Sequence, residues 1–92
     1  MTNMDGSWRV KRLGGALPPL YGIRKEISGS AGVTKLGPLS LAPFDVVDHA
    51  LHYRPPFSGF VDVLEPRGES FRGRATFRGR EFGTFELRRA RA

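Results

Sequence analysis

The chain has 92 residues, of which 39% are hydrophobic and 26% charged, and this balance predicts one globular domain over residues 1–92, not a disordered segment. It has no cysteine, which excludes disulfides and thiolate metal sites, and no apolar run suited to a membrane span or secretory signal, so a cytoplasmic location is the default expectation. The formal net charge of +6 is concentrated from Arg67 onward, where eight arginines stand against three glutamates, so the C-terminal part is the candidate region for anionic partners.

The first strand is expected over Ser7–Leu13, after a loose leader at residues 1–5. Trp8 and Val10 fall on one face of this strand, and charged residues alternate with them on the other. The glycines and prolines of residues 14–19 then break the pattern, as turn and loop residues do.

A second strand is expected over Tyr21–Ser28, followed by a turn, a short strand at Val33–Leu36 and a loop up to Pro43. The apolar face of the second strand contains Tyr21, Ile23 and Ile27. Lys25 falls on the same face, against the pattern.

The segment Phe44–Arg54 has two possible structures. As a strand it places Val47, His49, Leu51 and Tyr53 on one face; as a helix it groups Val46, Val47, Ala50 and Leu51. A strand is favoured because the neighbouring elements are strands and tyrosine is common in sheets. His49 and His52 would then point to opposite faces, so they predict no shared metal site.

A further strand is predicted over Phe57–Leu64, with a turn at Glu65–Gly68. Both of its faces carry apolar side chains, which indicates burial on two sides or an oligomer contact. Phe57, Gly59, Val61 and Val63 form one face; Phe60, Asp62 and Leu64 form the other.

The C-terminal stretch contains the tetrapeptide FRGR twice, at Phe71–Arg74 and Phe77–Arg80. This repeat resembles RNA-binding arginine–glycine segments, but its phenylalanines alternate in phase with glycine and alanine, which favours a hairpin. A three-residue loop, Arg78-Gly79-Arg80, would pair Phe71 with Leu87 and would place every apolar residue of both strands inward except Phe82.

These elements predict an all-β fold: a small antiparallel meander β-barrel or rolled sheet of about six to eight strands. The sequence contains no Ser-His-Asp set, no carboxylate pair at catalytic spacing and no cofactor fingerprint. We therefore propose no catalysis and predict no cofactor and no metal.

Gly6-Ser7-Trp8 opens the first strand, and the last strand ends in FELRR. This arrangement resembles the calycin superfamily, which comprises the lipocalins, fatty-acid-binding proteins and avidins. The resemblance implies a calycin-like barrel closed by Gly6, Trp8 and Arg89, with the Arg89 guanidinium packed over the indole. The chain is shorter than a typical lipocalin, which implies a narrow barrel or one completed by a homodimer.

The leading functional hypothesis is a small soluble barrel that binds a small hydrophobic ligand in its interior. The residues expected to line that cavity are Trp8, Tyr21, Ile23, Val47, His49, Leu51, Tyr53, Val61 and Phe85.

Two alternatives remain open. One is a nucleic-acid-binding barrel of the OB or SH3-like type, with Phe60 and Phe82 as stacking platforms. Its anion-binding face would consist of Arg72, Arg74, Arg78 and Arg80. The other is a homo-oligomeric interaction module in which Phe60, Leu64 and Phe82 form the interface.

Overall fold

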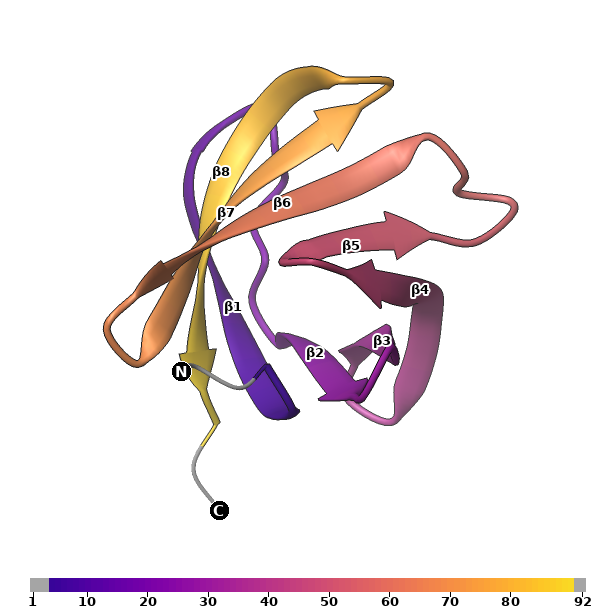
Figure 1. The fold of residues 1–92 in the computed structure, drawn as a ribbon. Coiled ribbons are helices and arrows are strands. Elements are labelled where there is room, and N and C mark those ends of the chain that lie inside the picture. Colours follow the sequence, from indigo (N-terminus) through magenta and orange to yellow (C-terminus); the bar gives the residue numbers. More distant parts are fainter. Residues whose placement is uncertain (1–3, 91–92) are drawn as a thin grey trace.

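In a computed structural model that describes residues 4–90, the chain forms one closed antiparallel barrel in which every strand pairs with the next along the sequence (Figure 1). The strands are β1 (Gly6–Gly15), β2 (Ile23–Ser28), β3 (Ala31–Leu36), β4 (Leu39–Val47), β5 (Ala50–Tyr53), β6 (Phe60–Arg67), β7 (Ser70–Phe77) and β8 (Arg80–Arg89). The predicted all-β meander is confirmed. Within the described residues no helix is long and apolar enough to cross a membrane.

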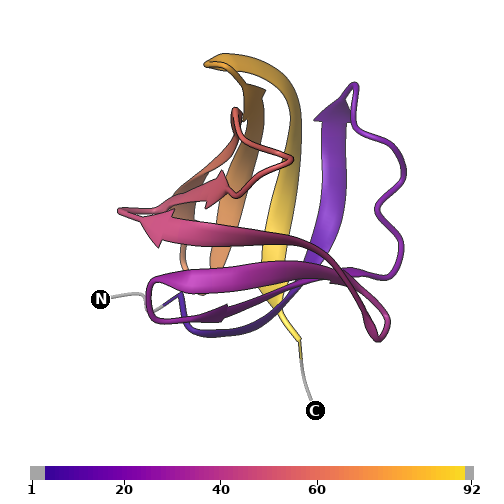
Figure 2. The ribbon, with the colours of Figure 1, turned by 90° about the vertical axis from the view of Figure 1, so that its right-hand side faces the viewer.

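The barrel closes where β1 pairs with β8. Trp8 stands opposite Arg89 and Val10 opposite Leu87, and the amide of Ala90 donates a 2.9 Å hydrogen bond to the carbonyl of Ser7. Figure 2 shows β8 and β1 side by side, with the β1–β2 loop running down the outside of the molecule. The sheet therefore has no free edge strand within the described residues.

One half of the barrel is filled by a packed core. The rings of Trp8 and Phe71 meet edge to face, with their centroids 5.3 Å apart. The side chains that fill this half are Trp8, Ile27, Phe44, Leu51, Leu64, Phe71 and Leu87, all of them buried. We call this half the closed end.

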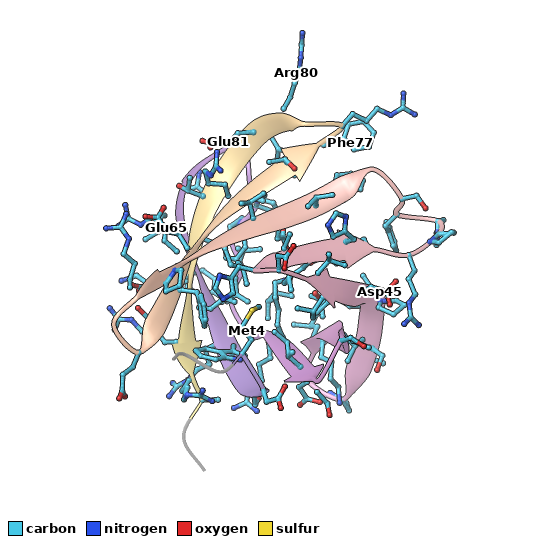
Figure 3. The ribbon with its side chains drawn as sticks, in the orientation of Figure 1. Met4, Asp45, Glu65, Phe77, Arg80 and Glu81 are labelled. Atoms are coloured by element: carbon cyan, nitrogen blue, oxygen red, sulfur yellow. The ribbon has the colours of Figure 1, made fainter. Side chains whose placement is uncertain are left out.

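The closed end extends to Met4. The indole Nε1 of Trp8 donates a 2.8 Å hydrogen bond to the Met4 carbonyl, and the Met4 side chain is buried against the core (Figure 3). Residues 1–5 were predicted to be a loose leader. Residues 1–3 lie outside the described residues, but Met4 and Asp5 are held in place, because the Asp5 carboxylate also accepts a hydrogen bond from the Gly29 amide.

Two glycines make room for aromatic rings inside the barrel. A Cβ atom at Gly73 would lie 2.2 Å from the Phe85 ring, and one at Gly32 would lie 2.5 Å from the Phe44 ring. Neither distance is possible for real atoms, so each ring lies directly over the backbone of the facing strand. Glycine is therefore required at these positions by the packing of a narrow barrel.

The segment Phe44–Arg54 is neither a single strand nor a helix. It spans the end of β4, a two-residue turn at Asp48 and His49, and β5, with Val47 paired to Ala50. Asp48 has a φ of 48°, which is the left-handed conformation that such turns require. β4 also begins earlier than predicted, at Leu39, in a stretch expected to be a loop.

Away from its turn, the β7–β8 hairpin has the predicted register, but the turn itself is shorter than predicted. Phe71 pairs with Leu87 and Ala75 with Gly83, as expected, but Phe77 then pairs with Arg80 across a two-residue turn. The register shift leaves Phe82 as an extra residue in β8, a β-bulge. Consequently Phe82 is partly buried against the core and Phe77 is exposed, the reverse of the prediction.

The two predicted faces of β6 are correct, but the expectation that Val61 lines the cavity is wrong. Phe60, Asp62 and Leu64 face the interior and Val61 does not, and the strand runs from Phe60 to Arg67, through the predicted turn. Leu64 is buried and Phe60 and Phe82 line the interior, so these three residues do not form the exposed oligomer or stacking surface expected for them.

Candidate functional site

The half of the barrel opposite the core contains a pocket of about 300 Å³, and we call this half the open end. Its apolar wall is formed by Val10, Leu17, Leu20, Ile23, Leu41, Ala42, Phe57, Phe60, Ala75, Phe82 and Phe85. All eight strands contribute at least one lining residue, so the pocket is the barrel's own interior. Leu41 and Phe57 are both 40% exposed or more, which places them at the rim.

Four polar side chains form the floor of this pocket: Lys25, Thr34, Tyr53 and Asp62. The Lys25 ammonium donates hydrogen bonds to the Tyr53 hydroxyl and, at 2.8 Å, to the Thr34 hydroxyl. The Tyr53 hydroxyl donates in turn to Asp62 Oδ2 at 2.8 Å, and Lys25 Nζ lies 3.3 Å from the same oxygen. We call these four residues the polar floor.

The register of the strands explains how these groups meet. Lys25 on β2 stands directly opposite Thr34 on β3, and their side chains point the same way into the barrel. Tyr53 and Asp62 come from β5 and β6, across the interior. The Lys25 side chain therefore bridges the width of the barrel, and its charge also lies over the rings of Phe44, Tyr53 and Phe85, at 5.2 to 5.8 Å.

The pKa values reflect this burial. Burial alone would lower the pKa of Lys25, but attraction to the Tyr53 and Asp62 oxygens and the hydrogen bonds to them outweigh it, so the pKa is raised above its ordinary value. Burial also raises the pKa of Tyr53, and this rise exceeds the opposing effect of Lys25. At neutral pH the floor thus contains an ammonium and a neutral phenol.

The residues predicted to line the cavity separate into three groups. Ile23, Tyr53 and Phe85 line the pocket. Trp8 and Leu51 are fully buried, but they belong to the core at the closed end.

Four others lie outside the pocket. Tyr21 is 91% exposed and Val47 53% exposed, so the expectation that they line the interior is wrong. His49 lies in the β4–β5 turn with its ring 5.9 Å from that of Phe71, and Val61 is absent from the lining. The turn at Asp48 explains why Val47 and His49 do not line the interior, because it breaks the alternation that placed them on the same face as Leu51.

Lys25, Thr34 and Asp62 were not predicted as site residues. A signal was present, since Lys25 interrupts the apolar face of its strand and Asp62 alternates in phase with Phe60 and Leu64. Two opposite charges, each in the apolar phase of a strand, indicate a buried pair. We expected Val61, on the opposite face of β6, to line the cavity instead of Asp62.

The four arginines of the alternative anion-binding face do not form one basic surface. Arg72 stands between Glu65 and Glu86 in the sheet register, and Arg74 lies 3.8 Å from Glu81. Arg78 packs over the Phe77 ring at the β7–β8 turn, beside Arg80. Carboxylates are thus interleaved with two of the four arginines.

At the closed end, the Arg89 guanidinium lies 4.4 Å from the centre of the Trp8 ring and donates a 2.9 Å hydrogen bond to the Asp5 carbonyl. Gly6 has a φ of 126°, and a Cβ there would lie 2.8 Å from Arg89 Nη1. Glycine at this position therefore lets the arginine reach the indole.

Comparison of the chain with protein-family models, curated proteins and solved structures found no match. Among residues 4–90 no group of three or more histidine, cysteine or acidic side chains is arranged to hold a metal ion. The pocket and its polar floor are therefore the chemical features on which a functional proposal rests.

Proposed function

We propose that this protein binds a small, largely apolar molecule inside its barrel. The observation that carries the proposal is the pocket of about 300 Å³, which is lined by apolar side chains above the polar floor. Small-molecule sites are typically concave, mostly apolar and equipped with a few convergent polar groups, and this volume lies at the lower end of their range.

The charges of the polar floor indicate the kind of ligand. Lys25 and Asp62 compensate each other, and three acceptors surround the ammonium. A carboxylate ligand would have to compete with Asp62 for Lys25, and a cationic one would have to compete with Lys25 for Asp62. The site is therefore best suited to an uncharged ligand, with at most a hydroxyl or carbonyl group directed at the floor.

The closure at Trp8 and Arg89 supports a second part of the proposal, a relationship to the calycin superfamily. The supporting features are the meander order of the strands, the indole from the first strand beneath the guanidinium from the last, and the glycine at position 6. Such a relationship agrees with an interior binding site.

Binding is tested with N-phenyl-1-naphthylamine, an uncharged fluorophore that brightens in apolar surroundings. We expect saturable binding to the full chain. Ala42→Phe places a ring inside the pocket and is expected to weaken binding at least tenfold. Val47→Phe adds the same ring type at an exposed site and is the control. Circular dichroism and urea denaturation establish that both variants are folded.

Two results would overturn the proposal: no saturable binding by the wild-type chain, or equal binding by wild type and a folded Ala42→Phe variant. A competition series addresses the ligand class. Decanol should displace the fluorophore more effectively than decanoate at pH 8, and the reverse order would contradict the assignment of an uncharged ligand.

A further inference from the structure

We propose that the open end of the barrel docks on an anionic lipid bilayer, so that apolar ligands pass between the membrane and the pocket without crossing water. The ligand exchange rests on the proposed function, whereas the docking rests on the surface of the open end alone. Three features of that surface carry the inference: its exposed apolar side chains, its charge and its continuity with the pocket.

The exposed apolar residues gather at one end of the molecule. Eight large hydrophobic side chains are exposed in the described residues: Leu13, Tyr21, Leu36, Leu39, Leu41, Val47, Phe57 and Phe77. All except Val47 lie on loops or strand ends around the mouth of the pocket, and we call these seven the apolar rim. Tyr21 and Leu39 are 91% and 61% exposed. Exposed apolar groups concentrated in this way mark interaction sites.

The connections at the two ends differ in charge, although the terminal segments add Asp5, Arg88 and Arg89 at the closed end. The four connections at the open end, residues 16–22, 37–38, 54–59 and 78–79, contain Arg54 and Arg78 and no carboxylate. The three connections at the closed end, residues 29–30, 48–49 and 68–69, contain Asp48 and Glu69 and no lysine or arginine. Arg54 is paired with Asp45, so the strongest positive contribution at the mouth comes from the β7–β8 turn.

The β7–β8 turn presents its cation and its apolar group together. Arg78 packs over the ring of Phe77, and Figure 3 shows Phe77 and Arg80 projecting outward from the hairpin tip. An aromatic ring beside arginine suits the interface of a bilayer, where the ring reaches the acyl boundary and the guanidinium contacts phosphate. Basic residues near a surface of anionic lipids are attracted to it, in a manner that salt weakens.

Continuity with the pocket favours a lipid surface over a protein partner. Leu41 and Phe57 belong both to the apolar rim and to the pocket lining. An apolar molecule leaving the pocket would therefore pass directly onto the rim, and a bilayer is the one occupant that could receive it there. A second copy of this chain would instead cover the mouth.

The test is sedimentation of the full chain with vesicles of phosphatidylcholine alone or with 30% phosphatidylglycerol. We expect binding to the anionic vesicles, little binding to phosphatidylcholine alone, and loss of binding at 0.5 M salt. Leu39→Glu at the rim should weaken binding at least tenfold. Val47→Glu at the closed end is the matched control and should bind like wild type. Both positions are exposed, so neither change disturbs the core.

Three outcomes would overturn the proposal: no binding to anionic vesicles, equal weakening by both substitutions, or equal binding to the two kinds of vesicle. A dimer that Leu39→Glu dissociates, seen by light scattering without vesicle binding, would instead assign the rim to a second copy. Fluorophore binding in the absence of vesicles separates this test from that of the proposed function, since Leu39→Glu should leave it unchanged.

The exchange itself is measured as transfer of N-phenyl-1-naphthylamine from the protein to anionic vesicles. If transfer occurs during docking, its rate rises with vesicle concentration for wild type and for Val47→Glu. For Leu39→Glu the rate should be slow and independent of vesicle concentration, because the probe must first dissociate into water. A wild-type rate that is independent of vesicle concentration would contradict exchange at the membrane.

Discussion

Lys25 Nζ and Asp62 Oδ2 lie 3.3 Å apart in the middle of a barrel that is lined mostly with apolar side chains, and both side chains are at most 10% exposed. They come from strands on opposite sides of the interior. The pair divides the barrel into a packed closed end and an open end with a pocket. Its energetic and functional consequences can be measured separately.

Removing one member of this pair should cost far more than removing both. Lys25→Met leaves a buried carboxylate without its cation, and we expect the free energy of unfolding to fall by about 3–5 kcal/mol. The double variant Lys25→Met/Asp62→Leu replaces both charges with apolar groups and should recover most of that loss. Urea denaturation of the two variants provides the comparison.

The exposed pair of Arg54 and Asp45 is the control for that comparison. Arg54→Met should change the free energy of unfolding far less than Lys25→Met does, because exposed pairs contribute little. A double variant that is as unstable as Lys25→Met would contradict the assignment. So would a Lys25→Met variant that is as stable as wild type.

Stability should fall in alkaline solution. The pKa values of Lys25 and Tyr53 are both raised in the folded chain, so the folded state retains protons that the unfolded state releases. Their contribution is complete below the ordinary values of 10.5 and 10.0, and it is lost as the pH rises through the folded-state values. Urea midpoints measured between pH 8 and pH 11.5 should therefore decline above about pH 10.

Tyr53→Phe combined with Lys25→Met and Asp62→Leu removes the titrating groups of the polar floor and serves as the reference for this pH dependence. Its urea midpoint should decline less steeply over the same range. If wild type and this variant decline in parallel, groups outside the pocket cause the alkaline instability.

Gly73→Ala should destabilise the barrel through Phe85. The added methyl group would meet the ring at 2.2 Å, and overpacking of this kind typically costs about 1–3 kcal/mol. Phe85→Leu provides space for the added methyl group. The loss in free energy of unfolding of the double variant should therefore be smaller than the sum of the losses of the two single variants. Thermal or urea denaturation of all four chains measures this coupling. Strict additivity would mean that the ring and the glycine do not constrain each other.

Arg89→Met tests the closure at the closed end. It removes the guanidinium from the Trp8 ring and its hydrogen bond to Asp5, and we expect a loss of about 1–2 kcal/mol in the free energy of unfolding. Arg88 is the neighbouring control, because its guanidinium pairs with Glu86 on the outer surface. Arg88→Met should have less than half the effect of Arg89→Met, and equal effects would contradict a specific role for Arg89.

The alternation of the sequence was sufficient to predict the fold class and much of the last hairpin. Phe71, Gly73 and Ala75 share a phase with Phe85 and Leu87, and a hydrophobic face of that length permits one register. The same phase places Arg89 on the side of Trp8. The turn was harder to predict, because a bulge at Phe82 adds a residue without changing the pattern before it.

The site was less accessible from sequence because it depends on pairs from distant strands. Lys25 and Asp62 each look misplaced when considered alone, and only their proximity across the barrel makes their burial favourable. The turn at Asp48 is similar, since a left-handed residue there converts one apparent strand into two. Such features are set by partners far away in the chain, not by local periodicity.

The pairing of β1 with β8 has a consequence for how the chain is made. Trp8 leaves the ribosome before the seven strands that follow it, and its partner Arg89 lies on the last of these strands, so the contact between them forms only after β8 has emerged. The early strands can pair with their neighbours as they emerge, but until β8 arrives they form an open sheet with β1 at a bare edge. Bare edges of this kind recruit other chains. The interval between the emergence of β1 and the arrival of β8 is therefore the period in which this small barrel is most exposed to aggregation.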